Sequence, residues 1–209
     1  MTDQHIPIID SLDLKQQTVL AQLKKETNRV LVTGAGGFLG KALCQFLRSA
    51  GIKVIGFARG NYPDLTAMGV TMIKGDLSDK QCLYDAMSGC DLVFHVASKA
   101  GVWGDKNSYF RPNVEGTDNI INACIAHNIR SLIYTSTPSV TFSGVDEEGI
   151  DESSPYASKF LNFYGLSKAL AEQKVLNSNS NSLKTVALRP HLIWGPGDRH
   201  LVPRVLARA

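Results

Sequence analysis

Short apolar runs alternate with segments of helical periodicity along most of the chain, from Asn28 onward. The runs are rich in Val, Ile, Leu and Phe without polar alternation, which is typical of strands covered on both faces. Predicted strands span Arg29–Thr33, Lys53–Ala58, Val70–Lys74, Leu92–Ala97, Ser131–Thr135 and Thr185–Arg189. Predicted helices lie between them, near residues 38–50, 79–88, 113–127 and 157–177. This repeated order predicts right-handed crossovers and therefore an α/β fold with a doubly wound parallel sheet.

Both ends of the chain lie outside this pattern. In residues 1–27 several apolar side chains fall near helical spacing, which predicts a short amphipathic helix packed on the main body. Residues 201–209 start like another helix and then stop. We therefore expect an N-terminal extension over residues 1–27 and a main domain over residues 28–209. We also expect a C-terminal substrate part to be missing.

The composition favours an ordinary soluble enzyme. The 209 residues suit one domain, and 44% hydrophobic with 20% charged residues is typical of a globular protein. The net charge of +3 is mild and its cations are spread along the chain, so nucleic-acid binding is not expected. No apolar run approaches the roughly 18 residues of a transmembrane helix, and the N-terminus does not resemble a signal peptide. These features predict a cytoplasmic protein.

The cysteine pattern gives no sign of a metal site. Cys44, Cys82, Cys90 and Cys124 are widely spaced and form no Cys-x-x-Cys pair, and the five histidines are scattered. We expect buried, reduced thiols and no bound metal.

A glycine-rich turn follows the first predicted strand and opens the first helix of the main domain. In such a turn Gly34 allows the tight bend, Gly37 lets backbone amides approach a pyrophosphate, and Gly40 allows close helix–sheet packing. The N-terminus of the helix then presents free N–H groups to the phosphates. The residues expected to contact a dinucleotide here are Gly34, Gly36, Gly37, Phe38, Leu39 and Gly40.

The end of the second predicted strand bears on the choice of cofactor. An acidic residue there would bind the ribose 2′-hydroxyl of NAD, whereas an arginine would pair with the 2′-phosphate of NADP. The chain has Arg59 at this point and no acidic residue before Asp64. We therefore expect NADPH to be preferred over NADH.

Tyr164 and Lys168 are four residues apart in a predicted helix and therefore share one face of it. An ammonium one turn away favours the phenolate and should lower the pKa of Tyr164. Tyr164 is then a candidate acid or base that passes a proton to a carbonyl oxygen as hydride arrives. Lys168 is expected to hold the nicotinamide ribose as well. Together with the glycine turn, the pair predicts hydride transfer to a carbonyl or from an alcohol.

A hydroxyl that donates to the substrate oxygen is expected at the C-terminal end of the fifth strand. The candidates there are Thr135, Ser136, Thr137 and Ser139. Spacing alone does not choose among them.

These motifs together resemble the extended short-chain dehydrogenases/reductases, over residues 28–209. The resemblance rests on the turn Thr33–Gly40, on Gly75-Asp76-Leu77, on the Asn-Val-x-Gly-Thr stretch at 113–117 and on Leu188-Arg189-Pro190. It implies a Rossmann fold. It also implies that Asp76 and Leu77 contact the adenine, that Asn113 belongs to the catalytic group, and that Pro190 lies near the nicotinamide. It favours Thr137, preceded by Ser136, as the hydroxyl donor. Ala97 and Ser98, at the end of the fourth strand, are further expected cofactor contacts.

Within that family, the stretches at 99–104, 136–140 and 146–153 resemble the 3β-hydroxysteroid dehydrogenase branch. This likeness implies an NADPH-dependent reductase that converts a ketone to a secondary alcohol on a hydrophobic substrate. The expected substrate is a 2-alkyl-3-oxoalkanoate, which is a β-keto acid, or a sterol-like 3-keto or 3β-hydroxy compound. Trp103, Tyr109 and Phe110 either line an apolar mouth or pack in the core. We expect a homodimer, with association with other enzymes of the same pathway.

Two alternatives remain open from the sequence. One is an NAD-dependent nucleotide-sugar epimerase or dehydratase on the same fold. A dehydratase typically has an acidic pair directly after the threonine of strand five, where this chain has Pro138 and Ser139. The other is a protein that binds the cofactor but does not catalyse a reaction. In such a protein the pair of Tyr164 and Lys168 would have no role.

Overall fold

Six parallel strands form one sheet in the order β3-β2-β1-β4-β5-β6. The computed structural model describes residues 12–101, 103–146, 148–198 and 202–207. The strands are β1 (Arg29–Thr33), β2 (Lys53–Ala58), β3 (Thr71–Lys74), β4 (Leu92–His95), β5 (Ser131–Thr135) and β6 (Lys184–Leu188). The predicted α/β fold with a doubly wound parallel sheet is confirmed.

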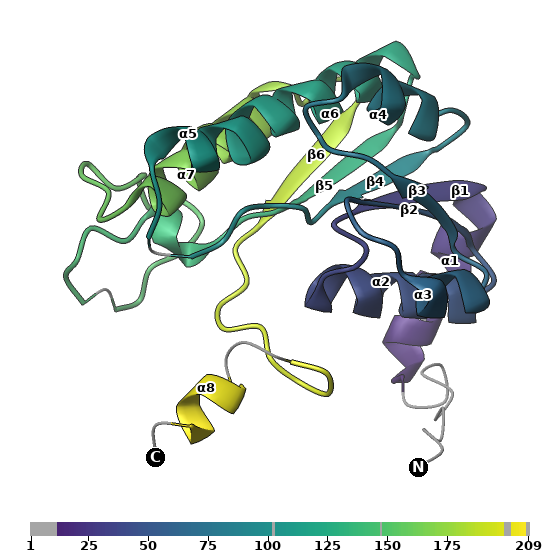
Figure 1. The fold of residues 1–209 in the computed structure, drawn as a ribbon, viewed down its shortest axis with the longest axis horizontal. Helices are drawn as coiled ribbons and strands as arrows, with labels where there is room; N and C mark the ends of the chain where they lie inside the picture. The colour runs from purple at the N-terminus through teal and green to yellow at the C-terminus, as the bar shows by residue number, and fades with distance from the viewer. Residues whose placement is uncertain (1–11, 102, 147, 199–201, 208–209) are drawn as a thin grey trace.

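Helices cover both faces of the sheet (Figure 1). One side carries α4 (Lys80–Ala86), α5 (Lys106–Phe110), α6 (Gly116–Ala126) and α7 (Phe163–Asn177), and the other carries α1 (Leu14–Glu26), α2 (Phe38–Ser49) and α3 (Pro63–Ala67). Each face has its own apolar core: one cluster includes Leu83, Ile120 and Val175, and the other includes Leu20 and Cys44. The sheet is therefore buried on both sides over most of its width.

The order of the strands reverses beside β1, because β2 and β3 lie on one side of it and β4 to β6 on the other. The C-terminal ends of parallel strands all meet one edge of the sheet, and a crevice forms at such a reversal. The loops after β1, β2 and β4 therefore converge at one place. This is where the glycine-rich turn lies.

Several boundaries differ from the predicted ones. The last long helix starts at Phe163 and not near residue 157, because the Asn162 side chain caps it by accepting from Gly165 N at 2.8 Å. The helix predicted from residue 113 is divided into a π-helix, Arg111–Glu115, and α6. Edge strand β6 is half exposed and does not follow the expectation of strands covered on both faces.

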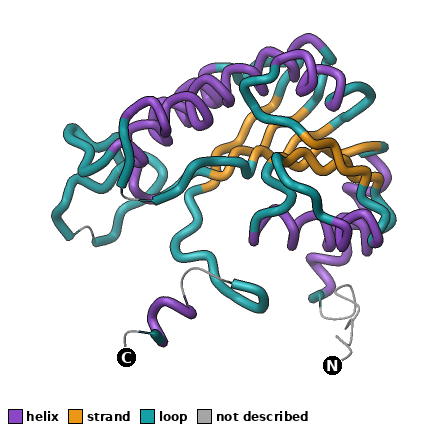
Figure 2. The backbone as a smooth tube through the Cα atoms, in the orientation of Figure 1, coloured by secondary structure: helices purple, strands orange, loops and turns teal. Residues whose placement is uncertain are grey.

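The ends of the chain are described in part. The expected N-terminal helix is α1, which buries Leu20 against the main body, while residues 1–11 lie outside the described residues. Helix α8 (Val202–Leu206) falls within the predicted C-terminal helix and stands apart from the sheet (Figure 1). Loop segments extend between β5 and α7 at the α5–α7 end of the molecule (Figure 2). Across the described residues, no helix has both the length and the apolar character needed to cross a membrane.

Candidate functional site

A cavity of about 940 Å³ opens at the C-terminal ends of β1, β2 and β4. Its lining contains nearly all the residues predicted to contact a dinucleotide, namely Gly34, Gly36, Gly37, Phe38, Leu39, Gly40, Arg59, Asp76, Leu77, Ala97 and Ser98. Three predicted contacts, Tyr164, Lys168 and Pro190, are not part of this lining. The sequence motifs, distant along the chain, thus meet at one crevice of the sheet.

The glycine turn leaves no room for side chains. Gly34 has φ +67°, and an ideal Cβ on it would lie 2.9 Å from the Ala97 backbone. A Cβ on Gly40 would lie 2.2 Å from the Gly34 carbonyl oxygen, and one on Gly36 would lie 1.9 Å from the Tyr62 ring. The contacts with backbone atoms explain why glycine is needed at positions 34 and 40, whereas a Cβ at position 36 would require the Tyr62 ring to move.

The site fits a dinucleotide phosphate in its electrostatics as well. Helix α2 has Gly37 as its N-cap and no side chain that caps it, so its first N–H groups remain free for an anion. Arg59 is exposed on the cavity wall, at the end of β2. A backbone cradle and a cation therefore face the same space.

Asp76 presents a carboxylate to the lining after β3. Its Oδ1 accepts from Ser78 N at 2.9 Å and from Ser78 Oγ at 2.7 Å. These two hydrogen bonds, with smaller contributions from Arg59 and Arg111, lower the pKa of Asp76. The carboxylate is thus fixed and ionised, which suits the predicted contact with adenine.

The cavity lining also includes residues that the sequence did not mark as cofactor contacts, among them Tyr62, Lys99, Ser108 and Arg111. Lys99 Nζ donates to Ser108 Oγ at 2.6 Å and lies 4.7 Å from the centroid of the Tyr109 ring. Ser108 belongs to α5, a five-residue helix that the sequence pattern did not predict. No periodic signal marks so short an element, so these residues could be found only from the structure.

The predicted acid or base, Tyr164, lies on the first turn of α7 and is partly buried. Its phenol lies close enough to Thr137 for that side chain to lower the pKa of Tyr164. Thr137 is the N-cap of a 3₁₀ turn, Pro138–Val140: its Oγ1 accepts from Ser139 N at 3.3 Å and donates to Ser139 Oγ at 3.3 Å. Of the four hydroxyl candidates, Thr137 is therefore the one placed against the phenol, and the buried Ser136 Oγ has no partner among the described residues.

The expected lowering of the Tyr164 pKa by Lys168 is wrong for this structure. Burial raises the pKa of Tyr164, and the nearby Thr137 side chain only partly opposes this. Lys168 is directed elsewhere: its Nζ donates to the Thr135 carbonyl at 2.6 Å and lies 4.0 Å from the centroid of the Tyr134 ring. Burial lowers the pKa of Lys168 itself to about 7, so its own charge is costly to maintain.

Asn113 joins the cavity to the helix that carries Tyr164. Its Oδ1 accepts from Lys99 N at 2.7 Å, and its Nδ2 donates to Lys99 O at 3.0 Å and to Ser167 Oγ at 3.0 Å. Ser167 in turn donates to the Tyr164 carbonyl at 2.9 Å. Asn113 is on the π-helix, a rare form that is frequent at functional sites. Its side chain thus fixes the spacing between the loop after β4 and α7.

A buried chain of hydrogen bonds connects the glycine turn to the same π-helix. Thr117 Oγ1 donates to the Asn113 carbonyl at 2.6 Å, so it accepts at 2.9 Å from His95 Nε2. His95 Nδ1 therefore carries no proton and accepts from Thr33 Oγ1 at 2.8 Å. Burial lowers the pKa of His95 to about 3, in accord with a neutral ring. One neutral imidazole thus ties β1, β4 and α6 together.

The remaining predicted residues are spread around this arrangement. Pro190 follows β6, and its neighbour Arg189 is paired with Glu172 of α7. Tyr109 is buried with its ring centroid 6.5 Å from that of Tyr164, whereas Trp103 is 91% exposed. Tyr109 therefore packs in the core, whereas Trp103 is exposed and Phe110 is partly exposed, so these two can line a mouth.

Comparisons with known proteins agree with this geometry. Residues 31–209 match the model of the 3-beta hydroxysteroid dehydrogenase/isomerase family. The 2-alkyl-3-oxoalkanoate reductase of Shewanella oneidensis is 63% identical over 95% of this chain and 53% of its own length. The enzyme of the same name from Stenotrophomonas maltophilia is 54% identical over 87% and 56%. This chain thus spans about half the length of these curated relatives.

A solved structure of MoeE5 in complex with UDP-glucose and NAD is similar in fold as well. Its TM-score is 0.72 at 32% identity, covering 82% of this chain and 56% of that one. The chain is therefore similar to this protein in fold as well as in sequence.

Replacement of Gly40 by alanine is expected to lower the free energy of unfolding by about 1–3 kcal/mol, because the added methyl group overlaps the Gly34 carbonyl. Urea denaturation measures the loss. Gly37→Ala is the control, since its Cβ would lie 3.2 Å from the same oxygen and should cost less. Equal losses in the two variants would contradict this account of the turn.

The neutral, buried His95 predicts acid sensitivity. Its folded pKa of about 3 is below the ordinary value of 6.5, so the unfolded chain binds the proton first as pH falls. Its contribution to stability is complete above pH 6.5 and decreases toward pH 3, by up to about 1.4 kcal/mol per pH unit. In urea titrations between pH 7 and 5, His95→Gln should depend less steeply on pH than the wild type. His191→Gln, at the surface, should keep the wild-type slope; an equally steep slope in His95→Gln would refute the assignment.

Proposed function

Because this chain belongs to the 3-beta hydroxysteroid dehydrogenase/isomerase family, we propose that the protein is an NADPH-dependent reductase of a ketone on a hydrophobic substrate. The observation that supports this most directly is the proximity of the Tyr164 phenol to the Thr137 side chain, at the edge of the sheet that also holds the glycine-turn cavity. A hydroxyl and a phenol that face one point can bind one carbonyl oxygen. The product is a secondary alcohol.

The residues have separate tasks in this reaction. When bound, the nicotinamide cofactor supplies a hydride to the carbonyl carbon and is itself oxidised. Thr137 donates a hydrogen bond to the carbonyl oxygen, and Tyr164 passes its proton to that oxygen as the C–H bond forms. Lys168 holds the ribose and offsets the charge of the resulting phenolate. The raised pKa of Tyr164 keeps the phenol protonated at neutral pH, as a proton donor must be.

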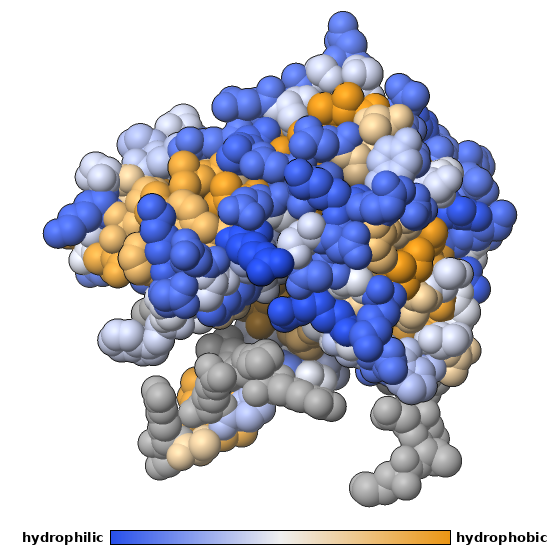
Figure 3. All heavy atoms as spheres, turned by 45° about the horizontal axis from the view of Figure 1, so that its top comes forward, coloured by the Kyte–Doolittle hydropathy of each residue, from blue (hydrophilic) through white to orange (hydrophobic). Residues whose placement is uncertain are grey.

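The proposed substrate is a 2-alkyl-3-oxoalkanoate, the class named in two relatives that share 63% and 54% identity with this chain. Exposed apolar side chains shortly before Tyr164 in the chain suit its alkyl chains: Leu161 is 63% exposed and Phe163 is 40% exposed. Other apolar patches interrupt the hydrophilic face in Figure 3. A sterol-like 3-keto compound has the same combination of a ketone with apolar bulk.

A nucleotide-sugar epimerase is the second candidate, supported by the likeness to the MoeE5 complex with UDP-glucose and NAD. An epimerase retains its NAD during turnover, whereas a reductase exchanges its cofactor. Mass spectrometry of the purified full-length protein separates the two. Tightly held NAD together with activity on UDP-sugars would favour the epimerase.

Tyr164→Phe should reduce turnover of a 3-oxo acid at least about 100-fold, since the proton donor to the alkoxide is lost. NADPH oxidation followed at 340 nm measures the loss in the full-length protein. NADPH affinity, measured by fluorescence, should be little changed. Tyr84→Phe, which alters a half-exposed phenol on α4, is the matched control and should keep wild-type turnover. Near-normal turnover in Tyr164→Phe would remove the basis of the proposed mechanism.

Arg59→Ala should raise the KM for NADPH about tenfold or more, because a charge-assisted hydrogen bond to the 2′-phosphate contributes about 1.5–3 kcal/mol. The KM for NADH should change little, because NADH lacks this phosphate, and it serves as the internal control. The measurement is the ratio of kcat/KM for the two cofactors. An unchanged ratio would mean that Arg59 does not select the cofactor.

A further inference from the structure

Glu172 is a buried carboxylate outside the proposed chemistry. It lies on α7, four residues after Lys168, and is 1% exposed. Arg189 reaches it with two nitrogens: Nη2 lies 2.6 Å from Oε1, and Nε lies 3.1 Å from Oε1 and 3.3 Å from Oε2. The Tyr156 hydroxyl donates to Oε1 at 3.0 Å. Burying an ion pair costs desolvation free energy, so stability alone does not explain why this pair is present.

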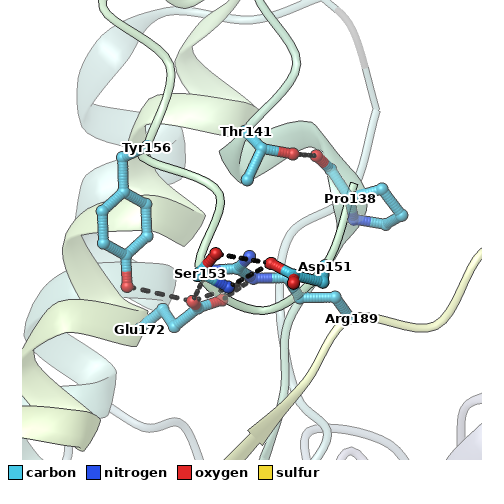
Figure 4. A network of polar contacts seen from close by, with 7 residues as sticks. All are labelled: Pro138, Thr141, Asp151, Ser153, Tyr156, Glu172 and Arg189. Atoms are coloured by element: carbon cyan, nitrogen blue, oxygen red, sulfur yellow. Dashed lines mark hydrogen bonds and ion pairs between the residues drawn. The ribbon is translucent and has the colours of Figure 1, made fainter. Parts of the chain in front are cut away.

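The three residues come from three parts of the chain, and Figure 4 shows them converging on one point. Tyr156 belongs to the loop before α7, Glu172 to α7, and Arg189 to the segment that follows β6. The guanidinium carbon of Arg189 also lies 5.5 Å from the centroid of the Tyr156 ring. Since Pro190 is next in the chain, the pair holds the expected nicotinamide-facing segment against the helix of Tyr164 and Lys168.

Glu172 also lies near the Lys168 ammonium, which has few charged neighbours. The titratable groups around Lys168 are Tyr134 on β5, His95 on β4, and Tyr164 and Glu172 one turn away on either side along α7. Burial raises the pKa of both phenols and lowers that of His95 to about 3, so all three are neutral near pH 7. Glu172 is therefore the group in this set that supplies a negative charge.

We infer that Glu172 is a positioning residue for the proposed reduction: through Arg189 it fixes the segment that carries Pro190, and its charge keeps the Lys168 ammonium protonated. The inference rests on the proposed function, because it assigns Lys168 a role in turnover. Removal of the carboxylate lowers the pKa of Lys168 below its value of about 7. The ammonium is then lost at a lower pH, and turnover decreases with it.

The test is the pH dependence of kcat for reduction of a 3-oxo acid by saturating NADPH, in the full-length protein, for the wild type and Glu172→Gln. The alkaline decline of kcat should move to lower pH by about one unit or more, since an adjacent opposite charge shifts a pKa by about that much. A merely structural ion pair would change stability and kcat but leave the position of the decline unchanged. An unchanged position overturns the inference.

Two further variants make the result decisive. Tyr156→Phe removes one hydrogen bond to the same carboxylate without removing charge, so its decline should stay at the wild-type pH; a shift as large as that of Glu172→Gln overturns the assignment to charge. If Glu172→Gln does not fold, Glu172→Met combined with Arg189→Met replaces the whole ion pair by apolar side chains, a change that proteins often tolerate. Its decline should also move to lower pH, and an unmoved decline overturns the inference. A wild type without turnover would overturn the proposed function instead, and the inference with it.

Discussion

The site depends on an ammonium group that is held almost without water. Lys168 is 1% exposed, and its charge is stabilised by the Thr135 carbonyl, by the face of the Tyr134 ring and by Glu172. A buried cation is costly unless such partners are in place. The ammonium keeps these partners only while α7 packs against the end of β5. Because Tyr164 lies one turn earlier on the same helix, the position of the ammonium also fixes the position of the phenol.

The cavity is lined mainly by loops after the strands, whereas the phenol lies on α7, so a separate set of contacts must fix their spacing. Asn113 supplies these contacts by bonding both to the backbone of Lys99, which lines the cavity, and to Ser167 on α7. His95 carries the same connection back to β1 through the buried core. Neutral hydrogen-bonded groups suit this task, because they fix distances in a low-dielectric interior without adding charge beside Lys168. Buried polar side chains thus hold the cavity and the Tyr164 phenol at a fixed spacing.

Much of the fold could be predicted from the sequence because its signals are local. Buried strands are continuous apolar runs in the sequence. The turn after β1 is marked by glycines, because its backbone is too crowded for a Cβ. The rest depends on tertiary contacts: α5 is too short to show periodicity, and α7 begins where Asn162 caps it. Spacing could not choose Thr137, since its hydroxyl is held by hydrogen bonds within the 3₁₀ turn that follows it. Nor could it reveal that Lys168 bonds to a backbone carbonyl, a group that every residue has.

The two titrating groups of the site are both shifted by burial, in a way that favours one direction of proton movement. Burial raises the pKa of Tyr164 and lowers that of Lys168 to about 7, so desolvation favours the neutral form of each. A neutral phenol can give a proton, but the phenolate that remains needs a cation nearby. Glu172 partly offsets the desolvation of that cation. In the proposed reduction, proton transfer therefore depends on a carboxylate that is 1% exposed, and whose own partner, Arg189, belongs to a different part of the fold.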